Sequence, residues 1–345
     1  TLASTGDYPY DVNGDGWIDV LSNGWKDGEI AWYENPGPDG VFAPGRRKEF
    51  TYPQHAFKIL QGYETETVAT HHWPRHVLAK IGTEMVENLA LHDFDGDGCP
   101  EIYVNGDKKA LYRFARNAEG HPSLEPAVET FTEGVGSGFA FGDVNGDGRD
   151  EVLTPSGFYV QPENKADLFM KPWEFHPETN LHCSRNLPSC PFVVAKLTDS
   201  GRNDIIWAEG HNYGLYWLEQ GEPKPDGTTT WTRHVIDESW SQAHVLVWAD
   251  IDGDGQPELI TGKRARTHVA PPPNGDAGCK ESGCIYSYHW DKAANKFTRH
   301  TIASPDEDIG IGMQIAVADL NGDGRPDLVV SGKTGTWILF NEGPR

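Results

Sequence analysis

The chain has 345 residues, of which 37% are hydrophobic, and it contains 39 glycines, 24 prolines and 12 tryptophans. Its formal net charge of −23 argues against nucleic acid and anionic membranes as partners. No apolar run approaches the roughly 18 residues that a membrane-spanning helix needs. This turn-rich, aromatic composition is typical of an all-β protein made of many short strands.

A nine-residue segment recurs six times and organises the whole chain. The copies begin at Asp11, Asp93, Asp143, Lys196, Asp250 and Asp319, so consecutive starts lie 82, 50, 53, 54 and 69 residues apart. A unit of about 50 residues is the size of a four-stranded propeller blade. The two long intervals indicate blades with insertions, at about residues 37–72 and 267–285.

Each unit contains the same four predicted strands in chain order. An apolar strand precedes the repeated segment, as at 314–318, and a β-branched strand follows it, as at 328–331. A third strand carries aromatic residues, and a fourth has an aromatic-x-Arg-His signature, at 73–76, 231–234 and 297–300. Because its histidine recurs at one position in different blades, we interpret it as a packing residue of the blade edge. We predict one β-propeller domain over residues 1–345, with six blades visible.

Five of the six copies combine oxygen ligands with a sharp turn. Positions 1, 3, 5 and 9 carry carboxylates or amides, position 7 offers its backbone carbonyl, and glycines at positions 4 and 6 permit the turn, which together suit Ca²⁺. The side chains predicted to ligate five structural calcium ions are Asp11, Asn13, Asp15, Asp19, Asp93, Asp95, Asp97, Glu101, Asp143, Asn145, Asp147, Glu151, Asp250, Asp252, Asp254, Glu258, Asp319, Asn321, Asp323 and Asp327.

The fourth copy, residues 196–204, departs from this pattern. Lys196, Thr198 and Ser200 replace three of the ligands. We therefore expect no metal there, and the Lys196 ammonium is a candidate to replace the cation.

The five cysteines fall into two close pairs and one single residue. Cys183 with Cys190 and Cys279 with Cys284 suggest two local disulfides, which would favour an oxidising compartment. The alternative is free thiols. Cys99 is left over inside a predicted calcium loop.

The repeated loops and the stretch Trp32-Tyr-Glu-Asn-Pro36 resemble the FG-GAP/VCBS-repeat family of seven-bladed β-propellers. The resemblance implies seven blades. Among the enzymes of the family, the chain looks most like secreted polysaccharide lyases of the rhamnosyl-glucuronate lyase type. The resemblance is specific for the fold and weak for the function.

Polar residues gather at the blade face that should lie opposite the calcium loops, where propeller ligands usually bind. Lys, Arg and His from at least four blades meet there in an acidic protein, as an anionic ligand would need. The candidates for catalysis are His211, His244, Tyr213 and Arg264, and those for substrate binding are Lys263, Arg266, Glu87, Asn88, Gln242, Gln314, Lys333 and Trp25. Arg185 and His268 fall at the same kind of position.

These residue types can divide the work of a uronate lyase. A positive group must neutralise the substrate carboxylate, a base must take the C5 proton, and an acid must protonate the leaving oxygen. Arg264 or Arg266 with Lys263 suits the first role. His211 and His244 suit the base and the acid, with Tyr213 competing for the acid. His72 and His92 form a second-ranked set, because they should lie toward the calcium loops.

The sequence therefore predicts a secreted, monomeric lyase that cleaves a uronate-containing glycan, such as the rhamnosyl-glucuronate of gum arabic, by β-elimination. Two alternatives stay open, a non-catalytic carbohydrate-binding propeller and a protein-interaction or adhesion propeller. A glycosidase is less supported, because it needs two carboxylates across the bond and only Glu87 and Glu209 fall in the right region.

Overall fold

The computed structural model describes residues 4–24, 28–37, 47–50, 68–71, 73–81, 86–106, 109–126, 131, 136–225, 228–269 and 275–343. The chain divides into two compact units, residues 1–89 with 114–125 and residues 90–113 with 126–345. Among the described residues no helix is long and apolar enough to cross a membrane.

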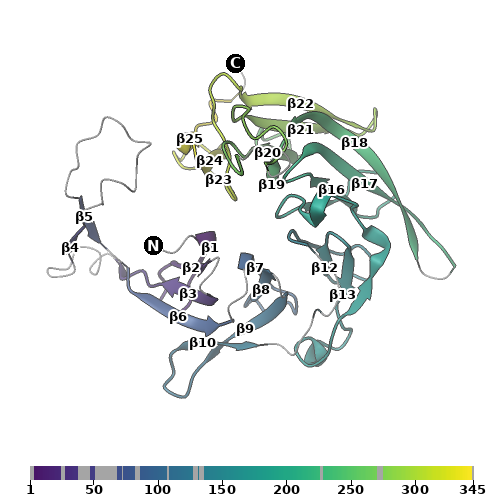
Figure 1. Cartoon of the computed structure of the whole chain (residues 1–345). Helices are drawn as coiled ribbons and strands as arrows, with labels where there is room; N and C mark the ends of the chain where they lie inside the picture. Colours follow the sequence, from purple (N-terminus) through teal and green to yellow (C-terminus); the bar gives the residue numbers. More distant parts are fainter. Residues whose placement is uncertain are drawn as a thin grey trace. The chain divides into compact units, whose positions relative to one another are not determined.

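Six antiparallel sheets of the blade type follow one another along the chain (Figure 1). The first contains β1 (Ser4–Tyr10), β2 (Asp19–Gly24), β3 (Glu29–Tyr33) and β6 (Arg75–Lys80). The second contains β7 (Val86–His92), β8 (Glu101–Gly106), β9 (Ala110–Arg116) and β10 (Pro122–Pro126). The third contains β11 (Ala140–Gly142), β12 (Glu151–Thr154), β13 (Gly157–Val160) and β14 (Glu174–His176).

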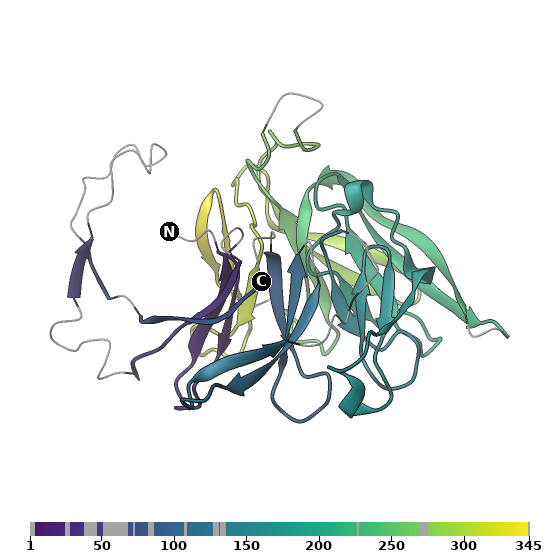
Figure 2. The same ribbon diagram turned by 60° about the horizontal axis from the view of Figure 1, so that its bottom comes forward.

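The second half of the chain supplies three further blades. The fourth contains β15 (Val193–Ala195), β16 (Asp204–Ala208), β17 (Tyr213–Pro223) and β18 (Thr229–Ser241). The fifth contains β19 (Ala243–Ala249), β20 (Glu258–Lys263), β21 (Ile285–Asp291) and β22 (Lys296–Ala303). The sixth has three strands, β23 (Ile315–Ala318), β24 (Asp327–Gly332) and β25 (Gly335–Leu339). The β17–β18 hairpin extends beyond the other strands of its sheet (Figure 2).

The remaining elements lie between the blade strands. β4 (Arg47–Phe50) and β5 (Val68–His71) pair inside the first predicted insertion. Three short 3₁₀ helices, η1 (Lys165–Asp167), η2 (Pro177–Thr179) and η3 (Ser184–Asn186), connect strands of the third and fourth blades.

This architecture confirms the predicted all-β propeller blades and corrects their number. The described residues form six blades, and not the seven that the resemblance implied. The first blade takes all four of its strands from residues 4–80, and the sixth ends at its third strand. Each of the six repeated segments thus corresponds to one blade.

The core lies along the second and third strands of the blades. Every residue of β16 and β20 is buried, as expected for apolar, β-branched strands that are covered on both faces. Trp207 and Trp217 are the largest fully buried side chains and belong to the main core of the fourth blade. Burying aromatic rings of this size is a main source of stability in such a core.

The histidines of the fourth strands pack at the blade edges, as the repeat indicated. His76 lies opposite Trp32 and stacks on it with ring centroids 4.7 Å apart, and His234 does the same with Trp217 at 4.3 Å. Each imidazole also contacts the glutamate that lies two residues after the tryptophan. His76 Nε2 is 2.8 Å from Glu34, and His234 Nε2 is 2.8 Å from Glu219. These side chains therefore serve the fold.

A side chain at the end of a third strand joins each later blade to the loop of the blade before it. The donor and the acceptor carbonyl are Gln161 Nε2 with Phe94 at 2.8 Å, Gln220 Nε2 with Val144 at 2.6 Å, Trp290 Nε1 with Leu197 at 2.7 Å, and Asn341 Nδ2 with Ile251 at 2.6 Å. In every case the carbonyl belongs to position 2 of the repeated segment. The loops thus hold neighbouring blades together inside the second unit.

The predicted disulfides are absent. All five cysteines are free thiols, and Cys183, Cys190, Cys279 and Cys284 are buried. Cys183 and Cys284 belong to the main core cluster, and burial raises the pKa of Cys183 to about 12. A buried, protonated thiol behaves as a small apolar side chain and does not react readily. Sequence proximity misled here, because nearness along the chain says nothing about which way two side chains point.

Candidate functional site

The five acidic loops, residues 11–19, 93–101, 143–151, 250–258 and 319–327, share one hydrogen-bond pattern. The position-1 carboxylate accepts the backbone N–H groups of positions 4 and 6, as Asp250 does from Gly253 at 2.7 Å and Gly255 at 2.9 Å. Both of these glycines have positive φ, near 80° and 87°, which glycine alone adopts without strain. The backbone therefore wraps around its own carboxylates.

The donor chemistry of these loops fits a hard cation. In the loop 250–258, one oxygen from each of Asp250, Asp252, Asp254 and Glu258 lies within 4.8 Å of the others. In the loop 143–151, burial and the nearby aspartates raise the pKa of Glu151 to about 8, and Glu101 reaches about 7 for the same reasons. A cation at the centre would relieve this repulsion.

The position-9 carboxylate has a second role that needs no ion. Its oxygen accepts the backbone N–H of position 2 in each of the six copies, including Asp204 with Leu197 at 3.1 Å in the fourth. Asp204 is fully buried although Lys196 and Thr198 replace the other acids. Lys196 is exposed, and among the described residues its ammonium makes no hydrogen bond or ion pair. The fourth loop therefore keeps the fold of the other five without their acid cluster.

A separate cluster of ionisable side chains forms where the fourth and fifth blades meet. His211 follows β16, His244 lies in β19, and Arg264 follows β20. Backbone hydrogen bonds tie these ends together, because Gln242 donates to Asn212 at 2.8 Å and Arg264 donates to Gln242 at 3.0 Å. Three of the four predicted catalytic residues thus come together.

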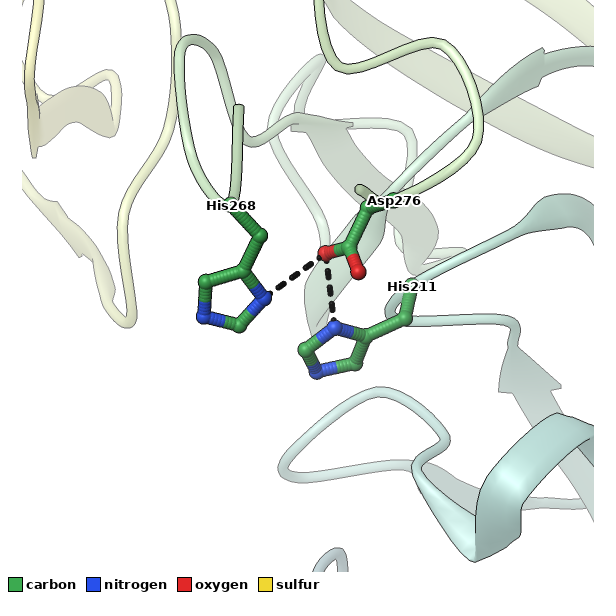
Figure 3. Close-up of side chains that lie close together, drawn as sticks. All are labelled: His211, His268 and Asp276. Carbon is green, nitrogen blue, oxygen red and sulfur yellow. Dashed lines mark hydrogen bonds and ion pairs between the residues drawn. The ribbon is translucent and has the colours of Figure 1, made fainter. Parts of the chain in front are cut away.

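Asp276 lies at the centre of this cluster (Figure 3). Its Oδ2 contacts Nδ1 of His211 at 2.7 Å, Nδ1 of His268 at 3.0 Å and Nη2 of Arg264 at 3.0 Å. Its Oδ1 accepts a hydrogen bond from Arg185 Nη2 at 2.7 Å. The Asp276 side chain is completely buried by these partners. We call these five residues the Asp276 cluster.

The carboxylate determines how the two histidines are protonated. An ionised carboxylate only accepts hydrogen bonds, so a histidine that bonds to it through Nδ1 carries its proton there. Arg264 Nη2 also lies 3.1 Å from Nδ1 of His211. The Nε2 atoms of both rings point away from Asp276 toward the same side (Figure 3). The rings of His211 and His268 stack with centroids 5.1 Å apart. Two imidazoles are thereby held next to each other with their Nε2 atoms available for proton transfer.

Burial and the two arginines set the charges in this cluster. Burial and then Arg264 lower the pKa of His211 to about 4, against the opposing effect of Asp276. Burial alone would raise the pKa of Asp276, but the hydrogen bond from Arg185 and the nearby histidines bring it below its usual value. Apart from its histidines, the cluster carries two positive charges, on Arg185 and Arg264, and one negative charge, on Asp276. It is a locally positive site in an acidic protein.

Strained backbone surrounds the same place. Arg185, Gln242, Arg266 and His268 all have positive φ, between 50° and 64°. Residues other than glycine rarely adopt this conformation, and such strain collects at functional sites. The surrounding contacts hold the strain, since Glu209 accepts hydrogen bonds from the Ser184 backbone at 3.0 Å and 3.1 Å, next to Arg185.

His244 lies behind His211, where solvent does not reach it. Its ring is 5.5 Å from that of His211, edge to face, and only 2% of the residue is exposed. Burial and then Arg264 hold its pKa well below the ordinary value. The structure therefore brings His244 into the cluster as a neutral neighbour of His211, and places His268 at the solvent side instead.

Lys263 and Tyr213 belong to a neighbouring network. Lys263 is buried, with Nζ 2.5 Å from Ser241 Oγ and 3.3 Å from Glu281, and burial lowers its pKa. The Tyr213 hydroxyl donates to Glu281 at 2.5 Å, which raises the pKa of Tyr213. Tyr213 is therefore a poorer acid than its position in the sequence suggested. Glu281 and Asp276 together anchor the segment 275–284 over the ends of the two blades.

The other predicted binding residues are spread more widely. Arg266 pairs with Asp308 at an exposed position, and Lys333 donates to the Arg266 carbonyl at 3.2 Å. Gln242 is buried and donates to the Ala277 carbonyl, whereas the Asn88 carbonyl oxygen accepts the N–H of Leu89. Gln314 immediately precedes β23. Trp25 lies outside the described residues, and Glu87 is described only by its backbone in β7.

The second-ranked set does not come together as a site in the described part of the chain. His92 Nε2 lies 2.9 Å from Asp150, and the imidazole packs against Phe94 and Phe141. This contact lowers the pKa of Asp150. His72 lies outside the described residues.

Sequence reasoning missed Asp276 and undervalued His268 and Arg185. Asp276 lies in the second insertion, where no repeat gives it a partner, and Arg185 lies in a 3₁₀ turn before β15. One signal in the sequence could have pointed to Asp276. Asp276 follows His268 by eight residues, in an insertion that comes soon after β20.

Comparison with known protein families agrees with the fold. Residues 93–154 and 197–261 match the family described as FG-GAP-like repeat, and residues 311–338 match the FG-GAP repeat. The chain contains FG-GAP repeats. The matched FG-GAP segments cover the acidic loops of the second, third, fifth and sixth blades and the altered loop of the fourth.

Two solved structures illustrate how far the likeness to known proteins extends. The Photorhabdus luminescens Tc holotoxin pore with the TccC3-D651A mutation is 15% identical, with a TM-score of 0.43, and the match covers 97% of this chain and 14% of that chain. The V. cholerae biofilm matrix protein Bap1 is 13% identical, with a TM-score of 0.32, and the match covers 97% and 78%. This chain thus spans only a small part of the first of these. No curated protein sequence matches it.

Proposed function

We propose that the protein is a polysaccharide lyase that cleaves a uronate-containing glycan by β-elimination at the Asp276 cluster. The observation that carries the proposal is the pair of imidazoles held by Nδ1 on one buried carboxylate, with both Nε2 atoms on the same side and two arginines beside them. A base next to positive charge is what abstraction of a proton beside a carboxylate requires.

We assign His211 as the base. It is neutral over the whole physiological range because burial lowers its pKa to about 4. Its Nδ1–H bond to Asp276 fixes the ring and stabilises the imidazolium that forms on proton uptake, as in other His–carboxylate pairs. His268, with half of its side chain exposed, is placed to protonate the leaving group.

The elimination balances with these two groups alone. His211 Nε2 takes the proton from C5, and the C–H electron pair forms the C4=C5 double bond. The C4–O bond breaks, and the glycosidic oxygen receives a proton from His268 in its imidazolium form. Solvent then returns both histidines to their starting state.

The arginines would bind the uronate carboxylate. Arg185 leaves 55% of its side chain exposed while it contacts Asp276, so one edge of its guanidinium remains accessible. Arg266 lies on the same segment as His268 and is also exposed. Guanidinium groups suit planar carboxylates, and charge neutralisation of the carboxylate acidifies the C5 proton.

We also propose that the five acidic loops bind Ca²⁺ as a structural ion. The ligands would be those of positions 1, 3, 5 and 9, and the ion would offset the repulsion that raises the pKa of Glu101 and Glu151. Loops that coordinate calcium would suit a secreted protein. The disulfides that also favoured secretion are not formed, so the extracellular location rests on the calcium proposal.

A direct assay tests the lyase. The protein is incubated with gum arabic, ulvan and other polyuronates, and the ultraviolet absorbance of the unsaturated uronate is followed with time. We expect the wild type to produce this band, and His211→Ala and His268→Ala to slow its appearance by at least about a hundredfold. His234→Ala is the matched control, because this imidazole packs on Trp217 at a blade edge and should leave the rate unchanged.

Each outcome has a defined meaning. Glycan binding without any absorbance rise on any substrate contradicts the lyase and favours the non-catalytic carbohydrate-binding propeller. Activity that survives both histidine substitutions places the chemistry elsewhere in the molecule.

A further inference from the structure

The acidic loop of the fifth blade, residues 250–258, has a histidine beside its carboxylates. His289 lies in β21, and its Nδ1 is 3.8 Å from both Asp252 Oδ2 and Glu258 Oε1. These distances exceed the limit of about 3.2 Å for a good hydrogen bond. One ligand atom from each of the three side chains lies within 4.8 Å of the others. The three atoms thus lie around a common space of the size that a metal ion needs.

Glu258 turns a buried, unpartnered oxygen toward this space. Its side chain is only 2% exposed, and its Oε2 accepts the backbone N–H of loop position 2 at 2.9 Å. Among the described residues, Oε1 accepts no hydrogen bond and has His289 as its ion-pair partner. In the third blade, Glu151 Oε1 instead accepts Asn145 Nδ2 at 2.9 Å. The fifth loop has Asp252 at that position, and an ionised carboxylate cannot donate. A cation is the partner that Glu258 Oε1 favours.

The internal repeat shows that this histidine departs from the other blades. Strand pairing places His289 where the fourth blade has Glu219, which lies 2.8 Å from the fourth-strand histidine His234. In the fifth blade, the ring of His289 packs against the fourth-strand His300, with centroids 4.3 Å apart. The corresponding residues of the other four blades are Glu34, Arg113, Val160 and Phe340. Within the described part of the chain, the fifth loop is therefore the one acidic loop that has an imidazole from its third strand.

Two carboxylates with one imidazole favour a transition metal over Ca²⁺. Ca²⁺ takes oxygen ligands, whereas an imidazole nitrogen suits ions such as Zn²⁺. Around Zn²⁺, with bonds of about 2.1 Å, tetrahedral ligand atoms lie about 3.4 Å apart. The 3.8 Å separations of His289 Nδ1 from the two carboxylates therefore need little adjustment. As a ligand, Nδ1 is unprotonated and the proton of the ring is on Nε2.

The Asp276 cluster is a poorer place for such an ion, although His211, His268 and Asp276 also offer ligand atoms close together. Arg264 Nη2 lies 3.0 Å from Asp276 Oδ2 and 3.1 Å from His211 Nδ1, so a guanidinium already supplies the positive charge there. In the fifth loop, no lysine or arginine of the described residues pairs with either carboxylate of the set. Burial and the neighbouring aspartates also raise the pKa of Glu258, a repulsion that a bound cation relieves.

We propose that Asp252, Glu258 and His289 bind Zn²⁺ in preference to Ca²⁺. The inference rests on the cation-binding role proposed for the acidic loops and assigns a different ion to one of them. The ion joins β21 to the loop 250–258 of the same blade. Asp250 and Asp254 remain beside the site, so Ca²⁺ still enters this loop when no transition metal is present. The other four acidic loops keep Ca²⁺.

Metal analysis of the whole protein tests this site. The protein is stripped with a chelator and dialysed against excess Ca²⁺ and a low concentration of Zn²⁺, and its bound metals are measured by inductively coupled plasma mass spectrometry. We expect the wild type to retain one Zn²⁺ per chain. His289→Gln should bind Zn²⁺ at least about tenfold more weakly, since even the partners of a metal ligand contribute that much to affinity. The calcium content of the same sample reports on the other loops, so a failure of the calcium proposal is seen separately.

A second substitution at the same position keeps the test independent of folding. His289→Glu restores the residue type of Glu219, can pair with His300, and should exchange the preference for Zn²⁺ for one for Ca²⁺. His234→Gln and His268→Gln are the matched controls and should leave the zinc content unchanged. Zinc that Ca²⁺ displaces from the wild type, or that both variants at position 289 retain equally, overturns the proposal. Zinc that is lost with His268→Gln instead places the ion at the Asp276 cluster and overturns it as well.

Discussion

Two groups of carboxylates in this protein are held in different ways. In the acidic loops, each aspartate is bound by backbone N–H groups from its own nine-residue segment, as Asp319 is by Gly322 and Gly324. Asp276 is bound by side chains from three separate segments, including Arg185 and His211, which are far from it in sequence. The loop carboxylates serve the blade that contains them, whereas Asp276 orients side chains that come from separate segments of the chain.

This difference explains why one group recurs and the other does not. A loop that closes on its own backbone works in any blade, so the same pattern appears in each. The Asp276 cluster depends on an insertion and a 3₁₀ turn that, among the described residues, belong to the fourth and fifth blades alone. We therefore expect changes in the cluster to affect activity most and changes in the loops to affect stability most.

The largest expected effect is that of Asp276→Asn. This change removes the negative charge that orients both imidazoles and balances Arg185 and Arg264, so activity on polyuronate should fall by at least about a thousandfold. Leaving the partners of a buried ion pair uncompensated should also cost about 3 kcal/mol of stability. Asp308→Asn, which breaks the exposed pair with Arg266, is the control, and its rate should change far less. Equal losses of activity in the two variants would contradict a specific role of Asp276 in the reaction.

The next effect in size concerns calcium. Asp250→Asn changes position 1 of a complete loop, and Asp199→Asn changes the equivalent stretch of the fourth loop. Added Ca²⁺ should stabilise the wild type and Asp199→Asn by several degrees in thermal melts, and should stabilise Asp250→Asn less, because one site is lost. A melting temperature of the wild type that changes neither with added Ca²⁺ nor with a chelator contradicts the calcium proposal.

The pH dependence should be smaller and confined to a defined window. The pKa of His211 is lowered from 6.5 to about 4 in the folded protein, so the unfolded chain takes up a proton first as the pH falls. His211 therefore contributes stability that is complete above about pH 6.5 and is lost between there and about pH 4, at up to about 1.4 kcal/mol per pH unit. His211→Gln should lack this part of the acid destabilisation in chemical denaturation. The acidic limb of kcat/KM should likewise lie near pH 4, and a limb near 6.5 would show that another base operates.

The smallest effect tests the loops in the opposite direction. Replacing Lys196, Thr198 and Ser200 with aspartate restores the ligand pattern of the fourth loop, whose position-9 carboxylate Asp204 already has its backbone contacts. Equilibrium dialysis should then show one additional bound Ca²⁺, with a change of only a few degrees in melting temperature. No gain of calcium would show that the acids alone do not make the site.

The sequence predicted the blades and loops well because the repeat contains them whole. Spacing, strand pattern and the positive-φ glycines all lie within one unit of about 50 residues, and the fourth-strand histidines were correctly assigned to packing. The sequence also predicted that His211, His244 and Arg264 lie close together, because each lies at or next to the end of a strand in adjoining blades.

The remaining features depend on contacts that no periodicity encodes. Asp276 reaches the cluster from an insertion, and the cysteines expected to pair are free thiols. His244 was chosen as an acid from its position, but the depth at which β19 buries it cannot be read from neighbouring residues. The predicted number of blades was wrong for a related reason. The seventh blade was inferred from the family resemblance, and no segment of the sequence corresponds to it.

The mass of the products tests the central claim most directly. A digest of a polyuronate with the wild-type protein is analysed by mass spectrometry, beside the same digest with His211→Ala. Elimination at the Asp276 cluster predicts fragments whose new non-reducing ends are lighter by one water than those of hydrolysis, and their absence from the variant digest. Fragments that have gained a full water, or unsaturated fragments formed equally well by the variant, would contradict the account.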